Sequence, residues 1–321
     1  MAEQSKIRIL AVVGPTASGK SALALALAER LNGEIVSCDS MQIYRGMDIG
    51  TAKPTAEEQA RVRHHLVDCV DPDCVYSCAE YVEDAAAAVR EIASRGKLPI
   101  FCGGTGLYLD CVLRGGNFEE TESDPARREA LFAYAVEHGN EALHARLAEV
   151  DPESAAAIHP NNLKRVVRAL EIFESTGMTK SEADKRSRMV ESPYDAAVIG
   201  LRYEERERLY ERIDRRVDQM LDEGLLEETQ RLLDAGVFEK NATAAQAIGY
   251  KELLGYLRGE MLLSDAVEDL KRATRRYAKR QITWFGAKNY VCWVDAVENG
   301  KMRGFDDILQ SALDQISAEI D

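Results

Sequence analysis

The octapeptide Gly14-Pro15-Thr16-Ala17-Ser18-Gly19-Lys20-Ser21 decides the fold of this chain. It matches every fixed position of the phosphate-loop (P-loop) pattern G-x-x-x-x-G-K-[ST]. It follows the apolar run 7–13 and precedes the helix-forming run 22–30, and strand, loop and helix occur in this order around such a loop. Glycine and serine would also suit a plain tight turn. The order of the elements favours a phosphate-binding loop.

The residues of this loop indicate its chemistry. Gly14 and Gly19 allow the backbone to curl so that successive N–H groups face one point, and the following helix start adds free donors and partial positive charge. Lys20 supplies a full positive charge, and the Ser21 hydroxyl is placed to hold Mg²⁺. We therefore expect a Mg²⁺-dependent site for a polyphosphate or a diphosphate.

Size and composition are typical of a soluble globular protein. At ~150 residues per domain, the 321 residues suggest two domains. The early apolar run is too short to span a bilayer, so we expect no signal peptide, no membrane anchor and a cytoplasmic protein. The seven cysteines favour reduced thiols over a disulfide framework, and their spacing completes no zinc site.

Charge is distributed unevenly along the chain. The net charge is −14, yet residues 271–288 carry seven lysines and arginines and no acid, which leaves −21 for the remainder. Arg272, Arg276 and Arg280 recur every four residues on a predicted helix over 265–284, so they share one face. This basic face, with Tyr277 and Trp284 available for stacking, predicts a polyanionic partner such as a nucleic acid.

Two further segments are predicted to reach the edge of the sheet that carries the P-loop. A buried strand over 34–38 ends in Asp39-Ser40, and another over 98–102 ends in Gly103-Gly104-Thr105-Gly106. Ligands of open parallel sheets lie beyond the carboxyl ends of the strands. Asp39 is either a catalytic carboxylate or a cap or turn residue, and Thr105 either faces a ligand or caps a helix.

The order of the elements predicts an α/β fold, a P-loop doubly wound parallel sheet with an all-helical insertion domain. We expect the core domain in 1–116 and 193–321, and the insertion in 117–192, where only helical signals occur.

Several local features are also predicted. Thr55 with Glu58 and Ser77 with Glu80 read as capping boxes. We expect a strand over 65–70 and a Ser264 cap on the long basic helix. All the arginines of a charged helix over 204–220 are expected to be balanced by neighbouring acids.

Six motifs, in order along nearly the whole chain, resemble the bacterial tRNA dimethylallyltransferases. A P-loop alone is shared by many enzymes, but the motif at Asp39 together with the one at Lys279 is much more specific. The motifs are Gly14–Ser21, Asp39–Tyr44, Gly103–Tyr108, Arg165–Glu171, Gly249–Glu252 and Lys279–Phe285.

This resemblance implies transfer of a dimethylallyl group from dimethylallyl diphosphate to N6 of the adenine just 3′ of the anticodon, with release of diphosphate. Asp39 would be the general base, Thr105 would stabilise the departing diphosphate, and Arg216 would bind the diphosphate together with Gly14 to Ser21. The Ser21 hydroxyl would hold the Mg²⁺. With the basic helix, the resemblance implies tRNA contacts from Asp39, Ser40, Met41, Gln42, Thr105, Arg127, Lys164, Arg165, Arg168, Gln246, Gly249, Tyr250, Lys251, Arg272, Arg276, Lys279, Arg280, Gln281 and Trp284.

The chain departs from the family pattern in small ways. Lys164 stands where glutamine is common, and Lys251-Glu252 where Arg-Gln is common, which weakens those tRNA contacts more than the catalytic roles. No C-terminal zinc finger of the eukaryotic type is present, which favours the bacterial type.

Three other functions fit parts of the sequence. A P-loop small-molecule kinase would bind ATP, but it would leave the basic helix and the insertion without a role. A prenyltransferase could act on a free adenine nucleotide, and an RNA-binding switch could use a nucleotide only as a signal. We expect a monomer, because no stretch of the sequence predicts an exposed apolar surface.

Overall fold

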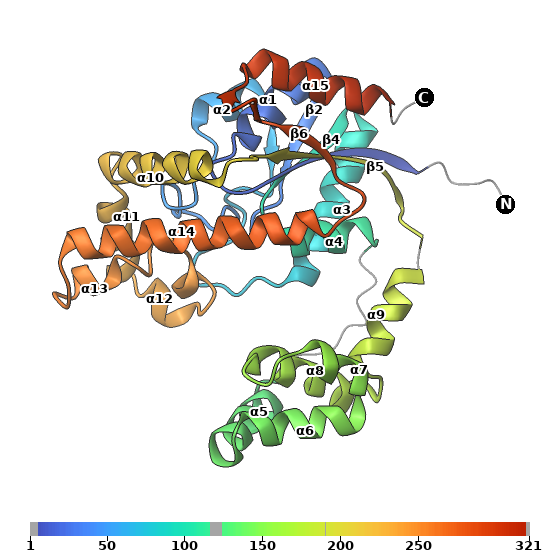
Figure 1. The fold of residues 1–321 in the computed structure, drawn as a ribbon, viewed down its shortest axis with the longest axis vertical. Helices are drawn as coiled ribbons and strands as arrows, with labels where there is room; N and C mark the ends of the chain where they lie inside the picture. The colour runs from blue at the N-terminus through green and yellow to red at the C-terminus, as the bar shows by residue number, and fades with distance from the viewer. Residues whose placement is uncertain (1–5, 116–123, 190, 319–321) are drawn as a thin grey trace. The chain divides into compact units, whose positions relative to one another are not determined.

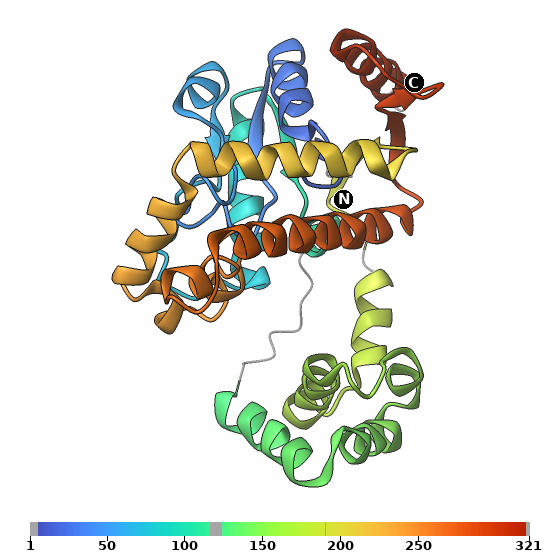
Figure 2. The same cartoon turned by 60° about the vertical axis from the view of Figure 1, so that its left-hand side comes forward.

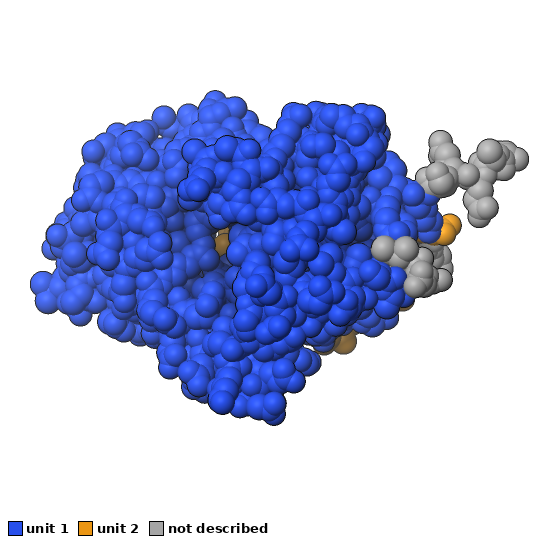
Figure 3. Space-filling view, turned by 90° about the horizontal axis from the view of Figure 1, so that it is seen from above, with its two compact units in different colours: residues 1–113, 193–321 blue, residues 114–192 orange. Residues whose placement is uncertain are grey.

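The computed structural model describes residues 6–115, 124–189 and 191–318. The chain divides into two compact units, residues 1–113 with 193–321 (unit 1) and residues 114–192 (unit 2). Figure 1 shows the elements of both units, and Figure 3 colours the units separately. Among the described residues, no helix is both long enough and apolar enough to cross a membrane.

Unit 1 is built on a six-stranded sheet in which every pairing is parallel. The strands lie in the order β3-β2-β4-β1-β5-β6, so β1 is flanked by β4 and β5. This confirms the predicted α/β class with a parallel sheet. The strands are β1 (Ile7–Val13), β2 (Gly33–Ser37), β3 (His64–His65), β4 (Leu98–Gly103), β5 (Tyr194–Arg202) and β6 (Cys292–Asp295).

Helices cover both faces of this sheet, as a parallel sheet requires. Along β1, Ile9, Ala11 and Val13 enter one buried cluster while Leu10 and Val12 enter the other, because successive side chains of a strand point to opposite faces. The first cluster includes side chains of α3 (Cys78–Ser94) and α4 (Gly106–Leu113), and the second includes those of α1 (Lys20–Arg30) and α15 (Phe305–Ala318).

Two long helices of unit 1 lie side by side in both ribbon views (Figures 1 and 2). They are α10 (Arg206–Asp222) and α14 (Leu263–Gly286). Lys271 of α14 pairs with Asp218 of α10 at 2.6 Å, and Arg275 pairs with Asp214 at 2.5 Å. These ion pairs fix the two helices to each other.

Shorter elements complete unit 1. They are α2 (Ala56–Arg61), α11 (Leu225–Asp234), α12 (Val237–Lys240), the 3₁₀ turn η1 (Ala244–Gln246), α13 (Leu254–Leu257), and a small antiparallel pair, β7 (Val297–Glu298) with β8 (Lys301–Met302).

The described part of unit 2 consists of helices around its own apolar core. Leu131, Leu143, Leu147, Val166 and Leu170 are among its buried residues. The helices are α5 (Pro125–His138), α6 (Asn140–Val150), α7 (Pro152–Ala157), α8 (Leu163–Thr176) and α9 (Lys180–Met189).

Local predictions had mixed outcomes. Both capping boxes are confirmed, each with the two reciprocal hydrogen bonds. The predicted strand over 65–70 is wrong beyond His65, because Leu66 (φ 58°) and Asp68 (φ 55°) adopt left-handed backbone that a strand cannot continue. The predicted Ser264 cap is also wrong, because the helix already begins at Leu263.

Candidate active site

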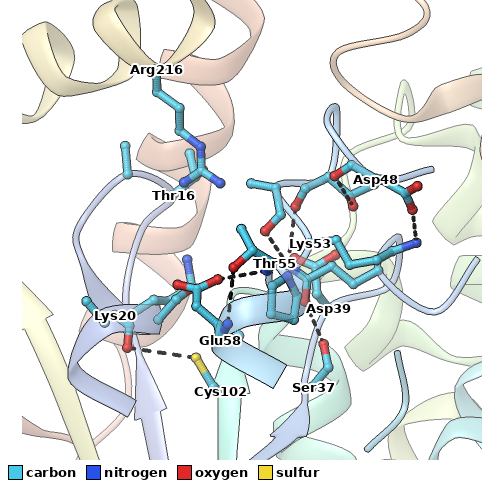
Figure 4. A pocket seen from close by; sticks show the side chains of 18 of the residues that line it. Thr16, Lys20, Ser37, Asp39, Asp48, Lys53, Thr55, Glu58, Cys102 and Arg216 are labelled. Atoms are coloured by element: carbon cyan, nitrogen blue, oxygen red, sulfur yellow. Dashed lines mark hydrogen bonds and ion pairs between the residues drawn. The ribbon is translucent and has the colours of Figure 1, made fainter. Parts of the chain in front are cut away.

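Three loops meet at one edge of the sheet because β2, β4 and β1 are neighbours. Asp39 follows β2, Gly104-Thr105 follows β4, and the P-loop follows β1. A cavity of about 940 Å³ opens there, with Thr16, Lys20 and Asp39 in its lining (Figure 4). The space-filling view also shows the surface of unit 1 to be hollowed (Figure 3).

The P-loop has the strained backbone of a tight anion-binding turn. Ala17 (φ 61°) and Gly19 (φ 95°) both adopt left-handed conformations, which glycine tolerates far better than alanine. The Ser18 hydroxyl is buried and has no hydrogen-bond partner among the described residues. A loop that keeps such strain and an unsatisfied hydroxyl is built for a ligand rather than for stability.

Two cations face this loop without a carboxylate partner. Among the described residues, neither Lys20 nor Arg216 forms an ion pair, and the Lys20 ammonium donates only to the Pro15 carbonyl, at 3.3 Å. Figure 4 shows Arg216 of α10 reaching toward Thr16. Burial lowers the pKa of both groups, Arg216 lowers that of Lys20 further, and the charge of Asp39 acts in the opposite direction on the pKa of both. Two desolvated cations at one point favour binding of an anion.

Arg212 is a site residue that sequence analysis missed. Its Nε donates to the Ala17 carbonyl at 2.8 Å, so α10 holds the P-loop directly. The expectation that all the arginines of this helix are balanced by neighbouring acids is wrong for Arg212, which forms no ion pair among the described residues. The signal was its spacing, because Arg212 and Arg216 lie one turn apart on the same face of α10.

Asp39 and Thr105 lie on neighbouring loops, as predicted from the strand ends. Asp39 Oδ1 accepts the Met41 N–H at 2.9 Å, which fixes its turn. Thr105 Oγ1 accepts the Ser40 N–H at 3.0 Å, and the Thr105 N–H donates to the Cys38 carbonyl at 3.1 Å. The backbones of the two loops are therefore bound together.

Helix α14 packs against the loop after β4. Gln281 is buried, and its amide hydrogen-bonds to Thr16 of the P-loop and to Gly104. A Cβ added at Gly106 would lie 2.2 Å from the Trp284 ring, so only glycine fits there. The same face of α14 presents Tyr277 to the cavity.

Some residues with implied tRNA contacts have structural partners instead. Tyr250 is fully buried and donates its hydroxyl to Glu228 at 2.7 Å, so its side chain has no surface that RNA could contact. Gly249 lies beside it with φ 110°. The Gln42 amide is used internally: its oxygen accepts from the Ser37 hydroxyl, and its nitrogen donates to carbonyls of the loop over 51–52. The side-chain contact predicted for Tyr250 is therefore corrected to a structural hydrogen bond with Glu228, and the tRNA contact predicted for Gln42, which lines the cavity, stays a prediction.

The basic face of α14 is smaller than its composition suggests. Four of the seven cations in 271–288 form ion pairs: Lys271, Arg272, Arg275 and Lys288, the last with buried Asp110. Arg276, Lys279 and Arg280 are exposed and form no ion pair among the described residues. Arg276 and Arg280 line a second cavity of about 340 Å³, together with Lys251. Gln246, which lies shortly before Lys251 in the chain, is also exposed.

The remaining residues with implied tRNA contacts lie in unit 2. Lys164 and Arg165 are exposed at the start of α8. Arg168 pairs with buried Glu171 at 2.8 Å, and Arg127 lies 3.9 Å from Glu174. Arg168 and Arg127 thus have acidic neighbours within unit 2.

The residues present fit a Mg²⁺ ion held together with a diphosphate. Among the described residues, no group of three or more His, Cys, Asp or Glu side chains could hold a metal by itself. Mg²⁺ usually keeps several waters and takes only one or two protein oxygens besides phosphate oxygens. The Ser21 hydroxyl, exposed in the cavity lining, is such an oxygen.

Comparison with known proteins gives consistent matches. The family model described as IPP transferase matches residues 42–288. The tRNA dimethylallyltransferase of Halalkalibacterium halodurans is 49% identical over 293 residues, which are 91% of this chain and 92% of the relative. That of Bacillus subtilis is 51% identical over 291 residues, 91% of each chain.

Solved structures agree with these matches. The full-length tRNA isopentenylpyrophosphate transferase of Bacillus halodurans is 46% identical, with a TM-score of 0.72 over 98% of this chain and 97% of that one. A eukaryotic dimethylallyltransferase acting on tRNA is 29% identical, with a TM-score of 0.80 over 98% of this chain and 79% of that one.

Proposed function

Because this chain belongs to the IPP transferase family, we propose that it transfers a dimethylallyl group from dimethylallyl diphosphate to tRNA, at N6 of the adenine 3′ to the anticodon. The family membership predicted from the motifs is confirmed by the match over residues 42–288. The relatives' activity favours this function over a small-molecule kinase.

One observation in the structure supports the donor site most directly. Lys20 and Arg216 are desolvated cations that form no ion pair among the described residues, and they share a cavity with the P-loop and with Asp39, whose charge favours the charged form of both. A diphosphate would satisfy both cations and accept from the backbone N–H groups at the start of α1. We therefore place the diphosphate of the donor between the P-loop and Arg216.

Asp39 supplies the proton acceptor in this scheme. An exocyclic aromatic amine is a poor nucleophile, so a carboxylate within hydrogen-bond reach must take its proton during attack. Asp39 takes the proton from N6 as the N6–carbon bond forms and the carbon–oxygen bond to diphosphate breaks. The negative charge that develops on the leaving diphosphate is stabilised by Lys20, Arg216 and the P-loop N–H groups. The role of Thr105 at the leaving group stays a prediction.

Mg²⁺ is part of the same proposal. The Ser21 hydroxyl and the diphosphate oxygens would hold the ion, which neutralises charge on the leaving group when it is bound.

The tRNA substrate fits the free cations of α14. Arg276, Lys279 and Arg280 are exposed without ion pairs among the described residues, and they offer charge for phosphate groups. An adenine in an anticodon loop is already unpaired, so moving it into a cavity costs only a few kcal/mol. The tRNA contacts of unit 2, a monomeric state and a cytoplasmic location stay predictions.

Thermal unfolding with candidate ligands tests the donor site. A ligand that binds only the native state raises the unfolding midpoint. With Mg²⁺ present, we expect dimethylallyl diphosphate to raise the midpoint more than ATP does at equal concentration. A kinase would show the opposite order, and a shift by ATP alone would overturn the proposal.

A further inference from the structure

We propose that Gln281 is a positioning residue that fixes the P-loop and the loop after β4 relative to each other, and that it does not contact RNA. The inference rests on the proposed function, because these two loops carry the groups assigned to the diphosphate and to the region of Asp39.

The amide of Gln281 joins the two loops directly. Its Oε1 accepts the Thr16 N–H at 2.8 Å, and its Nε2 donates to the Gly104 carbonyl at 3.0 Å. The side chain is only 4% exposed. A flipped amide would set donor against donor and acceptor against acceptor, so one orientation alone satisfies both loops.

The loop after β4 is shaped to receive this side chain. A Cβ added at Gly104 would lie 2.0 Å from Gln281 Nε2, and one added at Gly106 would meet Trp284. Tyr277, Gln281 and Trp284 follow the i, i+4, i+7 spacing of one helix face, so together they form the inner face of α14. The cations available for RNA, such as Arg280, are exposed.

The hydrogen bonds of Gln281 affect both the proposed diphosphate site and the loops that carry Thr105 and Asp39. On one side Gln281 occupies the Thr16 N–H, which is then withheld from the diphosphate. On the other side it fixes Gly104, next to Thr105, and Thr105 accepts the Ser40 N–H beside Asp39. The β1–β4 pairing holds the two loops together at Val13 and Gly103, and the Gln281 amide extends this connection to Thr16 and Gly104. A misplacement of ~1 Å at a reacting centre can cost about 100-fold in rate.

Substitution of Gln281 separates positioning from RNA contact. Gln281→Met keeps the length of the side chain and removes both hydrogen bonds. We expect kcat for transfer to fall ~10- to 100-fold, with a raised KM for dimethylallyl diphosphate, while the Kd for tRNA stays within about twofold. Arg280→Gln should give the opposite split, with weaker tRNA binding and an unchanged KM for the donor. Gln310→Met, at an exposed glutamine of α15, is the matched control and should behave like the wild type.

A double-mutant cycle tests the same link without relying on one variant. Gly104→Ala should push the Gln281 amide out of place, because the new Cβ would overlap Nε2. In a Gln281→Ala background the amide that the new Cβ would overlap is absent, so Gly104→Ala should have a much smaller effect on kcat. Strong non-additivity is expected of residues in contact, and additive effects on kcat would contradict the proposed link.

The outcomes also separate this inference from the proposed function. Absence of transfer by the wild type would overturn the function. Calorimetric binding of inorganic diphosphate would still test the link, with affinity expected to fall at least ~10-fold in Gln281→Met. Unchanged kcat and KM in Gln281→Met, or a loss confined to tRNA affinity, would overturn the positioning role. Should Gln281→Met not fold, Gly104→Ala alone decides the question, because it keeps Gln281 and displaces its amide: a fall in kcat at unchanged tRNA affinity supports the positioning role, and an unchanged kcat overturns it.

Discussion

The substitution Asp39→Asn removes the proposed general base while it keeps the local turn. Asp39 Oδ1 accepts the Met41 N–H at 2.9 Å, and the amide oxygen of asparagine can accept the same bond. The P-loop, Lys20 and Arg216 keep their side chains, although both cations lose the nearby negative charge of Asp39 that favours their charged forms. Asp39→Asn is therefore a cleaner test than Asp39→Ala, which would also remove that hydrogen bond, at about 1 kcal/mol of stability.

The magnitude follows from the role of the base. General-base catalysis contributes about 10²- to 10⁴-fold, which corresponds to ~2.7 to 5.4 kcal/mol of the activation free energy. We expect kcat of Asp39→Asn to fall by at least ~100-fold. The affinity for tRNA should stay within about tenfold, because a single contact at the cavity carries little of the phosphate-dominated binding energy.

Single-turnover transfer, with enzyme in excess over labelled tRNA, measures this step, and equilibrium binding of the same tRNA provides the control. A rate within about threefold of the wild type would refute the assignment of Asp39 as base. Loss of tRNA binding in parallel with the rate would point to a binding role instead.

Three further predictions follow from other parts of unit 1. Arg216→Gln should raise the KM for dimethylallyl diphosphate ~10- to 100-fold through loss of a charge-assisted contact, and steady-state kinetics showing an unchanged KM would remove Arg216 from the donor site. The double variant Arg276→Gln, Arg280→Gln should weaken tRNA binding and reduce the slope of log K against log salt by about 1.4, and an unchanged slope would mean that these side chains meet no phosphate. Burial would raise the pKa of Glu34, but hydrogen bonds from His65 and two further basic side chains outweigh it and hold the pKa at about 2. A carboxyl group whose pKa is lower in the native state than in the unfolded chain stabilises the native state at pH values above the unfolded pKa, here 4.5. Glu34→Gln should therefore reduce the free energy of unfolding by about 3 kcal/mol near pH 7. That cost should shrink as the pH falls from 4.5 toward 2, and denaturant titrations that show a pH-independent cost would contradict this account.

Local signals in the sequence predicted much of the site. The P-loop pattern depends on backbone geometry that only certain residues allow, so it could be located without a structure. Asp39 and Thr105 were placed at the same edge because strands that end together bring their loops together. The capping box at Thr55 was read from two residues that satisfy each other's backbone. Each of these inferences needed only short-range chemistry.

Tertiary contacts decided what the sequence left open. The spacing of α14 predicted a face of cations, but not that Lys271 and Lys288 would pair with acids far away in the chain. The resemblance implies RNA contact for the motif that contains Gln281, whereas this side chain is buried on the inner face of the helix. Left-handed backbone at Leu66 and Asp68 ended a strand that their apolar surroundings favoured. None of these outcomes has a local signature.

The most direct test of the central claim is mass analysis of nucleosides from unmodified tRNA incubated with this protein, dimethylallyl diphosphate and Mg²⁺. The account predicts that one adenosine, 3′ to the anticodon, gains one dimethylallyl group in place of a hydrogen on N6, with one diphosphate released for each group transferred. Unmodified adenosine after incubation with an active, folded protein, or a group appearing instead on free AMP or ATP, would contradict it.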